Sequence, residues 1–286
     1  MNLKFSLSVS TFVLTCVLCV APFANAQSIV AEKPKDAPKT TKPKKVEQPK
    51  PAKLDKNNLT AEQVVETVIF YSGGRAALGQ IRKTEVETGR ITRFAQNGGT
   101  DDSTYERFLI RGETVEKDRV RVNQKLSATE YSLIYSANKV FGIINDSTFE
   151  PRDEATDSFQ ATIHQGLDAL LRYKENGSTL ALIGKEKQMG VELYTVDITD
   201  KLNHTTRFNI SAKLFRVNSL EYTIKPKAEG AKPVKYVRRF YDYRLAQNLL
   251  VPFRSTLNAD GKEIEELNLS TMTYGAKIPE TQFQAV

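Results

Sequence analysis

Most of the chain from residue 83 onward alternates between apolar and polar side chains, which is the pattern of β-strands with one buried face. Turn-forming residues such as Asn97-Gly98-Gly99 and Asn258-Ala259-Asp260-Gly261 separate these stretches. Because the gaps have hairpin length, the strands should pair in antiparallel fashion. The sequence predicts eleven or twelve strands, in the ranges 84–94, 104–111, 115–124, 130–136, 139–144, 179–187, 191–199, 205–211, 213–224, 234–246, 251–258 and 262–274.

Helical periodicity occurs in two places. Thr60 and Gln63 form a capping box before apolar residues at helical spacing, and Gly73-Gly74 should end that helix, with a short second helix over 75–81. In the range 156–174, Phe159, Ile163, Leu167, Leu170 and Leu171 form one apolar stripe, with Asp157 or Ser158 as the cap. Such a helix should pack on the concave face of the sheet. The prediction is an α+β domain with one strongly curved antiparallel sheet.

The pattern within two strands and the closing hairpin predicts which residues share a face. Phe108 and Ile110 point one way while Arg107 and Arg111 alternate with them, and Val120 and Val122 alternate with Arg119 and Arg121, which is typical of a sheet with one solvated face. In the last strand Ile264 is out of phase with Leu267 and Leu269. We therefore expect a bulge near residues 265–266, or partial burial of both faces.

The first 58 residues differ from the rest. Residues 1–26 read as a secretory signal peptide, with Lys4, an apolar run and a cleavage site after Ala26, and they contain both cysteines, Cys16 and Cys19. Residues 27–58 hold nine lysines, four acidic residues and five prolines, so we expect a disordered linker that acts as a spacer or as a polybasic arm. From Leu59 onward 31 basic and 30 acidic residues nearly balance, which argues against nucleic acid as a partner. We therefore expect the protein to be exported and residues 59–286 to form the folded domain.

Residues that would indicate catalysis are sparse. The only histidines are His164 and His204, the mature chain has no cysteine, and no nucleophile motif is present. A metal site or a Ser-His-Asp triad would have to use one of these histidines. We therefore expect no enzyme activity, no cofactor and no metal. A curved sheet covered by helices can instead hold an apolar cavity that suits lipid tails, although a filled core would have the same composition.

The C-terminal region resembles the bacterial outer-membrane lipoprotein carrier and sorting family (LolA/LolB-like). The resemblance lies in Leu-Val-Pro-Phe-Arg before Asn-Ala-Asp-Gly-Lys, and in the exit Tyr-Gly-Ala-Lys-Ile-Pro-Glu-Thr-Gln-Phe, where Ile278 and Phe283 match and Tyr274-Gly275 replaces a usual Asn. Three further segments add to the resemblance: Gly73-Gly74-Arg75-Ala-Ala-Leu78, Asp118-Arg119-Val-Arg121 and Asn138-Lys-Val-Phe-Gly142. In the last of them Phe141 stands where Trp is usual. It spans residues 60–286 and implies an open β-barrel whose apolar cavity takes the acyl chains of a lipoprotein or another lipid.

The lipid-carrier hypothesis assigns roles to particular apolar residues, and the resemblance adds an arginine. Phe159, Ile163 and Leu167 would act as lid contacts, with Phe108, Ile110, Val120 and Val122 as the cavity floor. Arg119 or Arg121 would resemble the strand arginine that helps to hold the closed state. The expected function is a periplasmic carrier of lipid or lipoprotein acyl chains in outer-membrane biogenesis, with inner- and outer-membrane envelope proteins as further candidate partners. A scaffolding module with a filled core and a secreted hydrolase are the alternatives.

Overall fold

The computed structural model describes residues 59–95, 98–188, 190–227 and 230–285. The signal peptide and the linker predicted for residues 1–58 lie outside the described residues.

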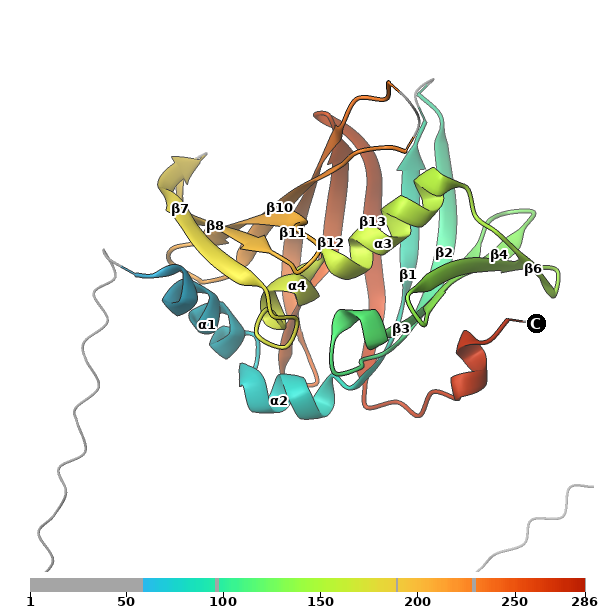
Figure 1. The fold of residues 1–286 in the computed structure, drawn as a ribbon, viewed down its shortest axis with the longest axis horizontal. Helices are drawn as coiled ribbons and strands as arrows, with labels where there is room; N and C mark the ends of the chain where they lie inside the picture. The colour runs from blue at the N-terminus through green and yellow to red at the C-terminus, as the bar shows by residue number, and fades with distance from the viewer. Residues whose placement is uncertain (1–58, 96–97, 189, 228–229, 286) are drawn as a thin grey trace, which may run out of the picture. The chain divides into compact units, whose positions relative to one another are not determined.

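One antiparallel sheet contains thirteen strands in the described ranges, in the order β6-β5-β4-β3-β2-β1-β13-β12-β11-β10-β9-β8-β7. The first and last strands therefore lie side by side at its centre. Strands β6 and β7 are the two edges, so the sheet is curved but not closed (Figure 1). The strands are β1 (Thr84–Phe94), β2 (Thr100–Ile110), β3 (Arg119–Lys125), β4 (Glu130–Ser136), β5 (Lys139–Ile144), β6 (Ser147–Phe149), β7 (Thr179–Gln188), β8 (Val191–Thr199), β9 (Thr205–Ser211), β10 (Val217–Ile224), β11 (Val234–Ala246), β12 (Leu249–Ala259) and β13 (Lys262–Tyr274).

The helices lie against the concave side of this sheet, as the sequence predicted (Figure 1). They are α1 (Ala61–Tyr71), α2 (Gly74–Ile81), α3 (Asp153–His164) and α4 (Leu167–Leu171), with 3₁₀ turns η1 (Val115–Lys117) and η2 (Glu280–Phe283). The capping box of α1 is present, because Thr60 Oγ1 accepts from the Gln63 amide and Gln63 Oε1 accepts from the Thr60 amide. Helices α3 and α4 form the crossover from edge strand β6 to edge strand β7.

Three predicted elements need correction. The helix expected over 156–174 begins at Asp153 and divides at Gln165-Gly166 into α3 and α4. A Cβ at position 166 would lie 2.5 Å from the carbonyl oxygen of Thr162, so the chain turns where only glycine fits. The strand expected over 115–124 begins as the turn η1, and the short strand β6 was missed, which brings the count from the twelve predicted ranges to thirteen strands.

Two apolar clusters hold the crossover against the two halves of the sheet. In the first, α1 and α4 pack on β8, β9 and β10, with Val65, Leu170, Val196, Phe208 and Ile210 buried together. In the second, Phe159 and Ile163 of α3 pack against Leu109, Val120 and Tyr135 from the first half of the sheet. Between these clusters the concave face is not filled by side chains.

The closing hairpin has the geometry that its sequence predicts. Asp260 and Gly261 both have positive φ, at 47° and 85°, which is the two-residue turn preferred between antiparallel strands. The register between β12 and β13 shifts beside Leu257, whose partner is Glu265, while Asn258 pairs with Glu263. Ile264 is therefore the extra residue of a bulge, one position before the predicted site.

Candidate functional site

A cavity of about 710 Å³ lies between the concave face of the sheet and the α3–α4 crossover. This volume is within the range of about 300–1,000 Å³ that is usual for small-molecule sites. Apolar side chains come from the first half of the sheet, from the crossover and from the second half. They include Ile91, Leu109, Val120, Val122, Leu133, Phe159, Ile163, Leu167, Leu171, Leu220, Phe240, Leu249, Val251, Leu257, Leu267, Leu269 and Met272.

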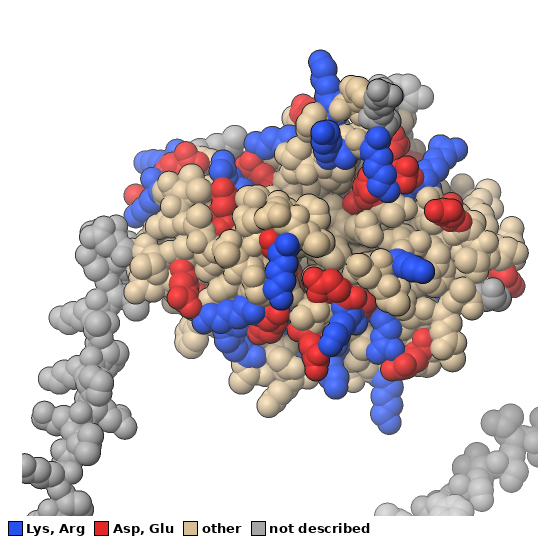
Figure 2. All heavy atoms as spheres, in the orientation of Figure 1, with Lys and Arg blue, Asp and Glu red and all other residues tan. Residues whose placement is uncertain are grey.

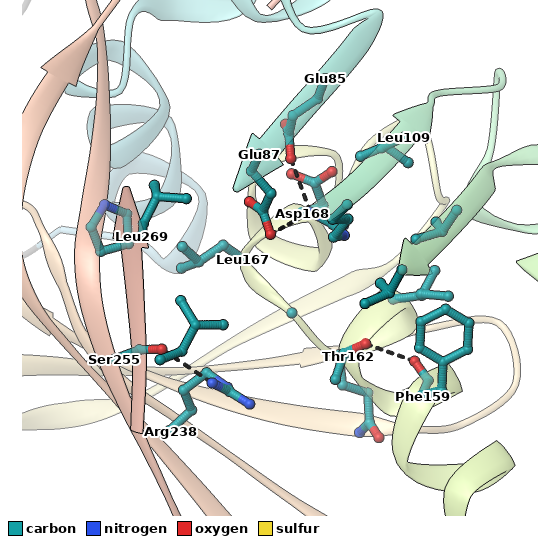
Figure 3. Close-up of a pocket in the computed structure, with 18 of the residues that line it drawn as sticks. Glu85, Glu87, Leu109, Phe159, Thr162, Leu167, Asp168, Arg238, Ser255 and Leu269 are labelled. Carbon is teal, nitrogen blue, oxygen red and sulfur yellow. Dashed lines mark hydrogen bonds and ion pairs between the residues drawn. The ribbon is translucent and has the colours of Figure 1, made fainter. Parts of the chain in front are cut away.

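One wall of the cavity carries an ion cluster that consists of Arg82, Glu85, Glu87, Arg107, Arg111 and Asp168. Glu85 is 2 % exposed and lies 2.9 Å from Arg107 Nη1 and 2.9 Å from Arg111 Nη2. Asp168 of α4 lies 2.7 Å from Arg111 Nη2 and 3.0 Å from Arg82 Nη2. Figure 3 shows Glu85 and Glu87 of β1 on the same side of the cavity as Asp168. The cluster therefore joins the crossover to the centre of the sheet.

The two acidic residues of β1 have opposite pKa shifts. Burial alone would raise the pKa of Glu85, but the guanidinium groups of Arg111, Arg107 and Arg82 outweigh it and hold this pKa below its ordinary value. The pKa of Glu87 is raised, chiefly by burial, because Arg107 alone lies close and Glu85 repels its charge. Glu87 is thus the acidic residue of the cluster whose charge is least well compensated.

A second polar group lies on another part of the wall. Arg238 Nη2 donates to Glu265 at 3.0 Å. Arg238 Nη1 donates to Ser255 Oγ at 3.1 Å, and Figure 3 shows this second contact. Arg93 Nε lies 3.7 Å from Glu265 and also contacts the amide of Gln124. These side chains satisfy one another, so a ligand beside them meets polar groups that already have partners.

The structure brings five of the predicted site residues to the cavity. Val120 and Val122 of β3 line it, as do Phe159 and Ile163 of α3 and Leu167 of α4. Whether they contact a lipid stays a prediction.

Phe108 and Ile110 do not line the cavity, which corrects the predicted floor. The register pairs Phe108 with Arg121 and Ile110 with Arg119, whereas Leu109 pairs with Val120. Because cross-strand partners share a face, Phe108 and Ile110 cannot share one with Val120 and Val122. They pack on the opposite face with other apolar residues, among them Ile134, Ile143, Ile278 and Phe283.

Arg119 and Arg121 also lie on this opposite face, where they hold the C-terminal segment. Arg119 Nη1 lies 2.8 Å from Glu280, and its guanidinium lies over the ring of Phe283. Arg121 Nη1 donates to the carbonyl of Gln282 at 3.0 Å. Ile278 and Phe283, which carry the sequence resemblance, are thus the residues of the C-terminal segment that cover the outer face of the sheet.

Arg107 and Arg111 are cavity residues that the sequence reasoning assigned to solvent. Their alternation with Phe108 and Ile110 is typical of a sheet with one wet face, yet both faces of β2 are covered in the structure. Glu85 and Glu87 could have revealed them, because these two residues lie on the neighbouring strand with their side chains on the same face. They supply the opposite charges for Arg107 and Arg111.

The two histidines lie apart from the cavity lining. His164 Nε2 lies 3.3 Å from the hydroxyl of Tyr135, and burial lowers the pKa of His164. His204 Nδ1 lies 3.0 Å from Asp200, with about half of its side chain exposed. In the described part of the chain no group of three or more His, Cys, Asp or Glu side chains could hold a metal ion.

The helices and the visible surface add two observations. None of the helices among the described residues combines the length and apolar character needed to cross a bilayer. Figure 2 shows basic and acidic side chains interspersed on the face in view, without a large area of one sign.

Comparisons with known proteins give similarity of structure but not of sequence. No protein-family model matches this chain, and curated protein sequences give no match. A LolA superfamily protein from Nitrosomonas europaea is similar in structure, with a TM-score of 0.53 and 12 % identity over 79 % of this chain and 98 % of that one. A protein described as an outer-membrane lipoprotein-sorting domain, from Vibrio parahaemolyticus, has a TM-score of 0.54 and 9 % identity, over 78 % of this chain and 95 % of that one. A DUF1329 family protein from Desulfovibrio piger has a TM-score of 0.54 and 9 % identity, over 79 % of this chain and 98 % of that one.

The strand order, the open edges and the helices on the concave side agree with these likenesses. At this level of identity they establish architecture and leave the ligand open. The chain has the LolA-like fold.

Proposed function

We propose that this protein binds a lipid, or the acyl chains of a lipoprotein, in the cavity beneath α3 and α4, and carries it through the periplasm in outer-membrane biogenesis. The observation that carries the proposal is the cavity itself, about 710 Å³ of space lined by apolar residues from both halves of the sheet. Burial of an apolar chain would supply the binding free energy, at roughly 25 cal/mol for each Å² removed from water. The alternative, a scaffolding module, assumes a core that side chains fill, so the presence of a cavity argues against it.

The absence of tryptophan allows a direct test. Leu267→Trp places a single indole in the cavity lining, and Thr273→Trp places one at an exposed position of the same strand. We expect a phospholipid with brominated acyl chains to quench Leu267→Trp fluorescence strongly and to leave Thr273→Trp fluorescence nearly unchanged. Equal quenching of the two variants, or none in either, would contradict binding in this cavity.

Native mass spectrometry of the mature protein, prepared from periplasm without detergent, would identify what the cavity holds. A series of masses that matches bound phospholipid or acylated peptide is the expected result. A single unliganded mass that lipid addition does not change would refute the proposal.

A further inference from the structure

The polar group around Glu265 has hydrogen-bond partners, but its charges do not balance. Arg93 of β1 and Arg238 of β11 both contact the Glu265 carboxylate, at 3.7 and 3.0 Å, and neither forms an ion pair with another acidic side chain in the described part of the chain. Asp101, the cross-strand partner of Arg93, is exposed and forms no ion pair with it. Two guanidinium groups therefore share one carboxylate, which leaves an excess of one positive charge.

The other charged residues in the cavity wall compensate one another. The ion cluster contains three arginines and three acidic residues. Asp118, which also lines the cavity, lies 2.7 Å from Arg172. Figure 3 shows Arg238 well apart from Glu85 of the ion cluster. The excess positive charge of the wall is therefore located at Arg93 and Arg238.

A tyrosine hydroxyl beside this pair of arginines has no partner. Tyr222 of β10 lines the cavity and is 6 % exposed, and among the described residues its hydroxyl forms no hydrogen bond. Its oxygen is not one of the unpartnered atoms that lack accessible surface, so a ligand in the cavity can reach it. The register pairs Tyr222 with Tyr236, which makes Tyr222 and Arg238 diagonal neighbours on one face. Because buried polar groups normally have partners, a free and accessible hydroxyl next to excess positive charge points to a ligand.

The apolar lining of the cavity begins directly beside these polar groups. Ile91 lies two positions before Arg93 on the same strand, is 7 % exposed, and has Leu267 as its cross-strand partner. Leu257 is the cross-strand partner of both Arg238 and Glu265. The side chain of Arg93, in contrast, is 40 % exposed. The wall thus passes from a solvent-accessible cation to a buried apolar surface, which suits an amphiphile.

We propose that Arg93, Arg238 and Tyr222 form a head-group site for the negatively charged group of an amphiphilic lipid, either a carboxylate or a phosphate. Guanidinium groups bind such anions through paired N–H donors. Each carries five N–H groups, which is more than the present contacts occupy. The anion accepts hydrogen bonds from both arginines and from the tyrosine, while the chain occupies the apolar lining. This inference rests on the proposed lipid-binding function and specifies its ligand class.

The test is isothermal titration calorimetry of the full mature chain with dodecyl phosphate, dodecanoate, dodecanol, dodecylammonium and inorganic phosphate. Each dodecyl probe is kept below the concentration at which it forms micelles. We expect the tighter of the two anionic dodecyl probes to bind about tenfold more tightly than dodecanol, as for hydrogen bonds to a charged group. Dodecylammonium should bind most weakly of the four. Inorganic phosphate should bind far more weakly than dodecyl phosphate, because it has no apolar surface to bury.

Arg93→Met should lower the affinity for the anionic probe about threefold to tenfold and leave the affinity for dodecanol unchanged. Arg90→Met is the matched control, because it removes the same charge from the same strand at an exposed position that does not line the cavity. This control should keep the full preference for the anion. The melting temperature of Arg93→Met should stay close to that of the unchanged protein, since its contact with Glu265 is long and partly exposed.

Tyr222→Phe should also lower the affinity for the anionic probe, by about threefold to tenfold. Tyr241→Phe is its control, because Tyr241 is 39 % exposed and does not line the cavity. Equal effects of the two tyrosine substitutions would exclude Tyr222 from the site.

The outcomes separate the two proposals. If neither anionic dodecyl probe binds more tightly than dodecanol, or if Arg90→Met weakens anion binding as much as Arg93→Met, the head-group site is wrong while lipid binding stands. If inorganic phosphate binds as tightly as dodecyl phosphate, the site takes a free anion and the assignment to a lipid is wrong. If none of the four dodecyl probes binds, the proposed function fails together with the inference.

Discussion

Arg111 should be the most sensitive position in the wall of the cavity. Its side chain is 8 % exposed, and it contacts Glu85 at 2.9 Å and Asp168 at 2.7 Å. Arg111→Met leaves three acidic residues of the cluster with the two cations Arg82 and Arg107. Removal of one partner from a buried ion pair costs roughly 3–5 kcal/mol, because the remaining charge stays buried. For a domain of this size that corresponds to a fall in melting temperature of about 6–20 °C.

Urea unfolding at neutral pH, followed by circular dichroism, measures this cost. Arg207→Met is the matched control, because Arg207 also makes a two-pronged contact with a carboxylate, at 2.8 and 2.9 Å from Asp197, but its side chain is 45 % exposed. We expect the control to lose less than about 1 kcal/mol. A loss for Arg111→Met that is no larger than that of the control would refute the assignment of the cluster as buried and mutually compensated.

A double variant sharpens the test. Glu85→Gln combined with Arg111→Met leaves two cations and two acidic residues in the cluster, so its charge balance is restored. We therefore expect the double variant to lose less stability than the sum of the two single variants, with a coupling of about 0.5–3 kcal/mol. Strict additivity would mean that the two side chains do not act through their charges.

Three further predictions concern other parts of the domain. Glu87→Gln should stabilise the protein at pH 7, because the pKa of Glu87 is raised in the folded state. A carboxyl group of this kind lowers the free energy of unfolding as the pH rises from the ordinary glutamate pKa of about 4.3 through the raised pKa. The gain in stability should vanish in urea unfolding below about pH 4, and a gain that persists there would contradict the assignment. Phe283→Ala should lower the free energy of unfolding by about 3–5 kcal/mol in urea, since the Phe283 side chain is 3 % exposed. It should leave the affinity for lipid unchanged, and a reduced affinity would mean that the outer face of the sheet contributes to the cavity. Thr60→Ala should lower the free energy of unfolding by about 1 kcal/mol, because it removes the cap of α1. Thermal unfolding measures this cost, with Thr223→Ala at an exposed strand position as the control. Equal costs for the two variants would argue against the cap.

Alternation predicts which residues share a face of a strand, but it does not say which face is inside. On β2 the sequence correctly separates Phe108 and Ile110 from Arg107 and Arg111. The assignment of the apolar pair to the cavity failed because the C-terminal segment covers the outer face of β2 with Ile278 and Phe283. That cover comes from residues about 170 positions away in the sequence, so no local pattern could reveal it.

The same limit applies to the helix that crosses the cavity. Phe159, Ile163 and Leu167 were recognised by their spacing, and all three line the cavity. The division at Gly166 was not recognised, because the apolar stripe continues in phase into α4. The division depends on the close approach of Gly166 to the carbonyl of Thr162, four residues earlier, which is a backbone contact that the spacing of apolar side chains does not report.

A cavity of this size forfeits packing contacts, so other interactions must keep its walls apart. Phe159 and Ile163 fix α3 to the first half of the sheet, and Leu170 fixes α4 to the second. Between these anchors Asp168 is held by arginines rather than by apolar packing. Charged side chains resist collapse into an apolar core, because burial without their partners would be costly. The ion cluster therefore helps to keep the cavity open.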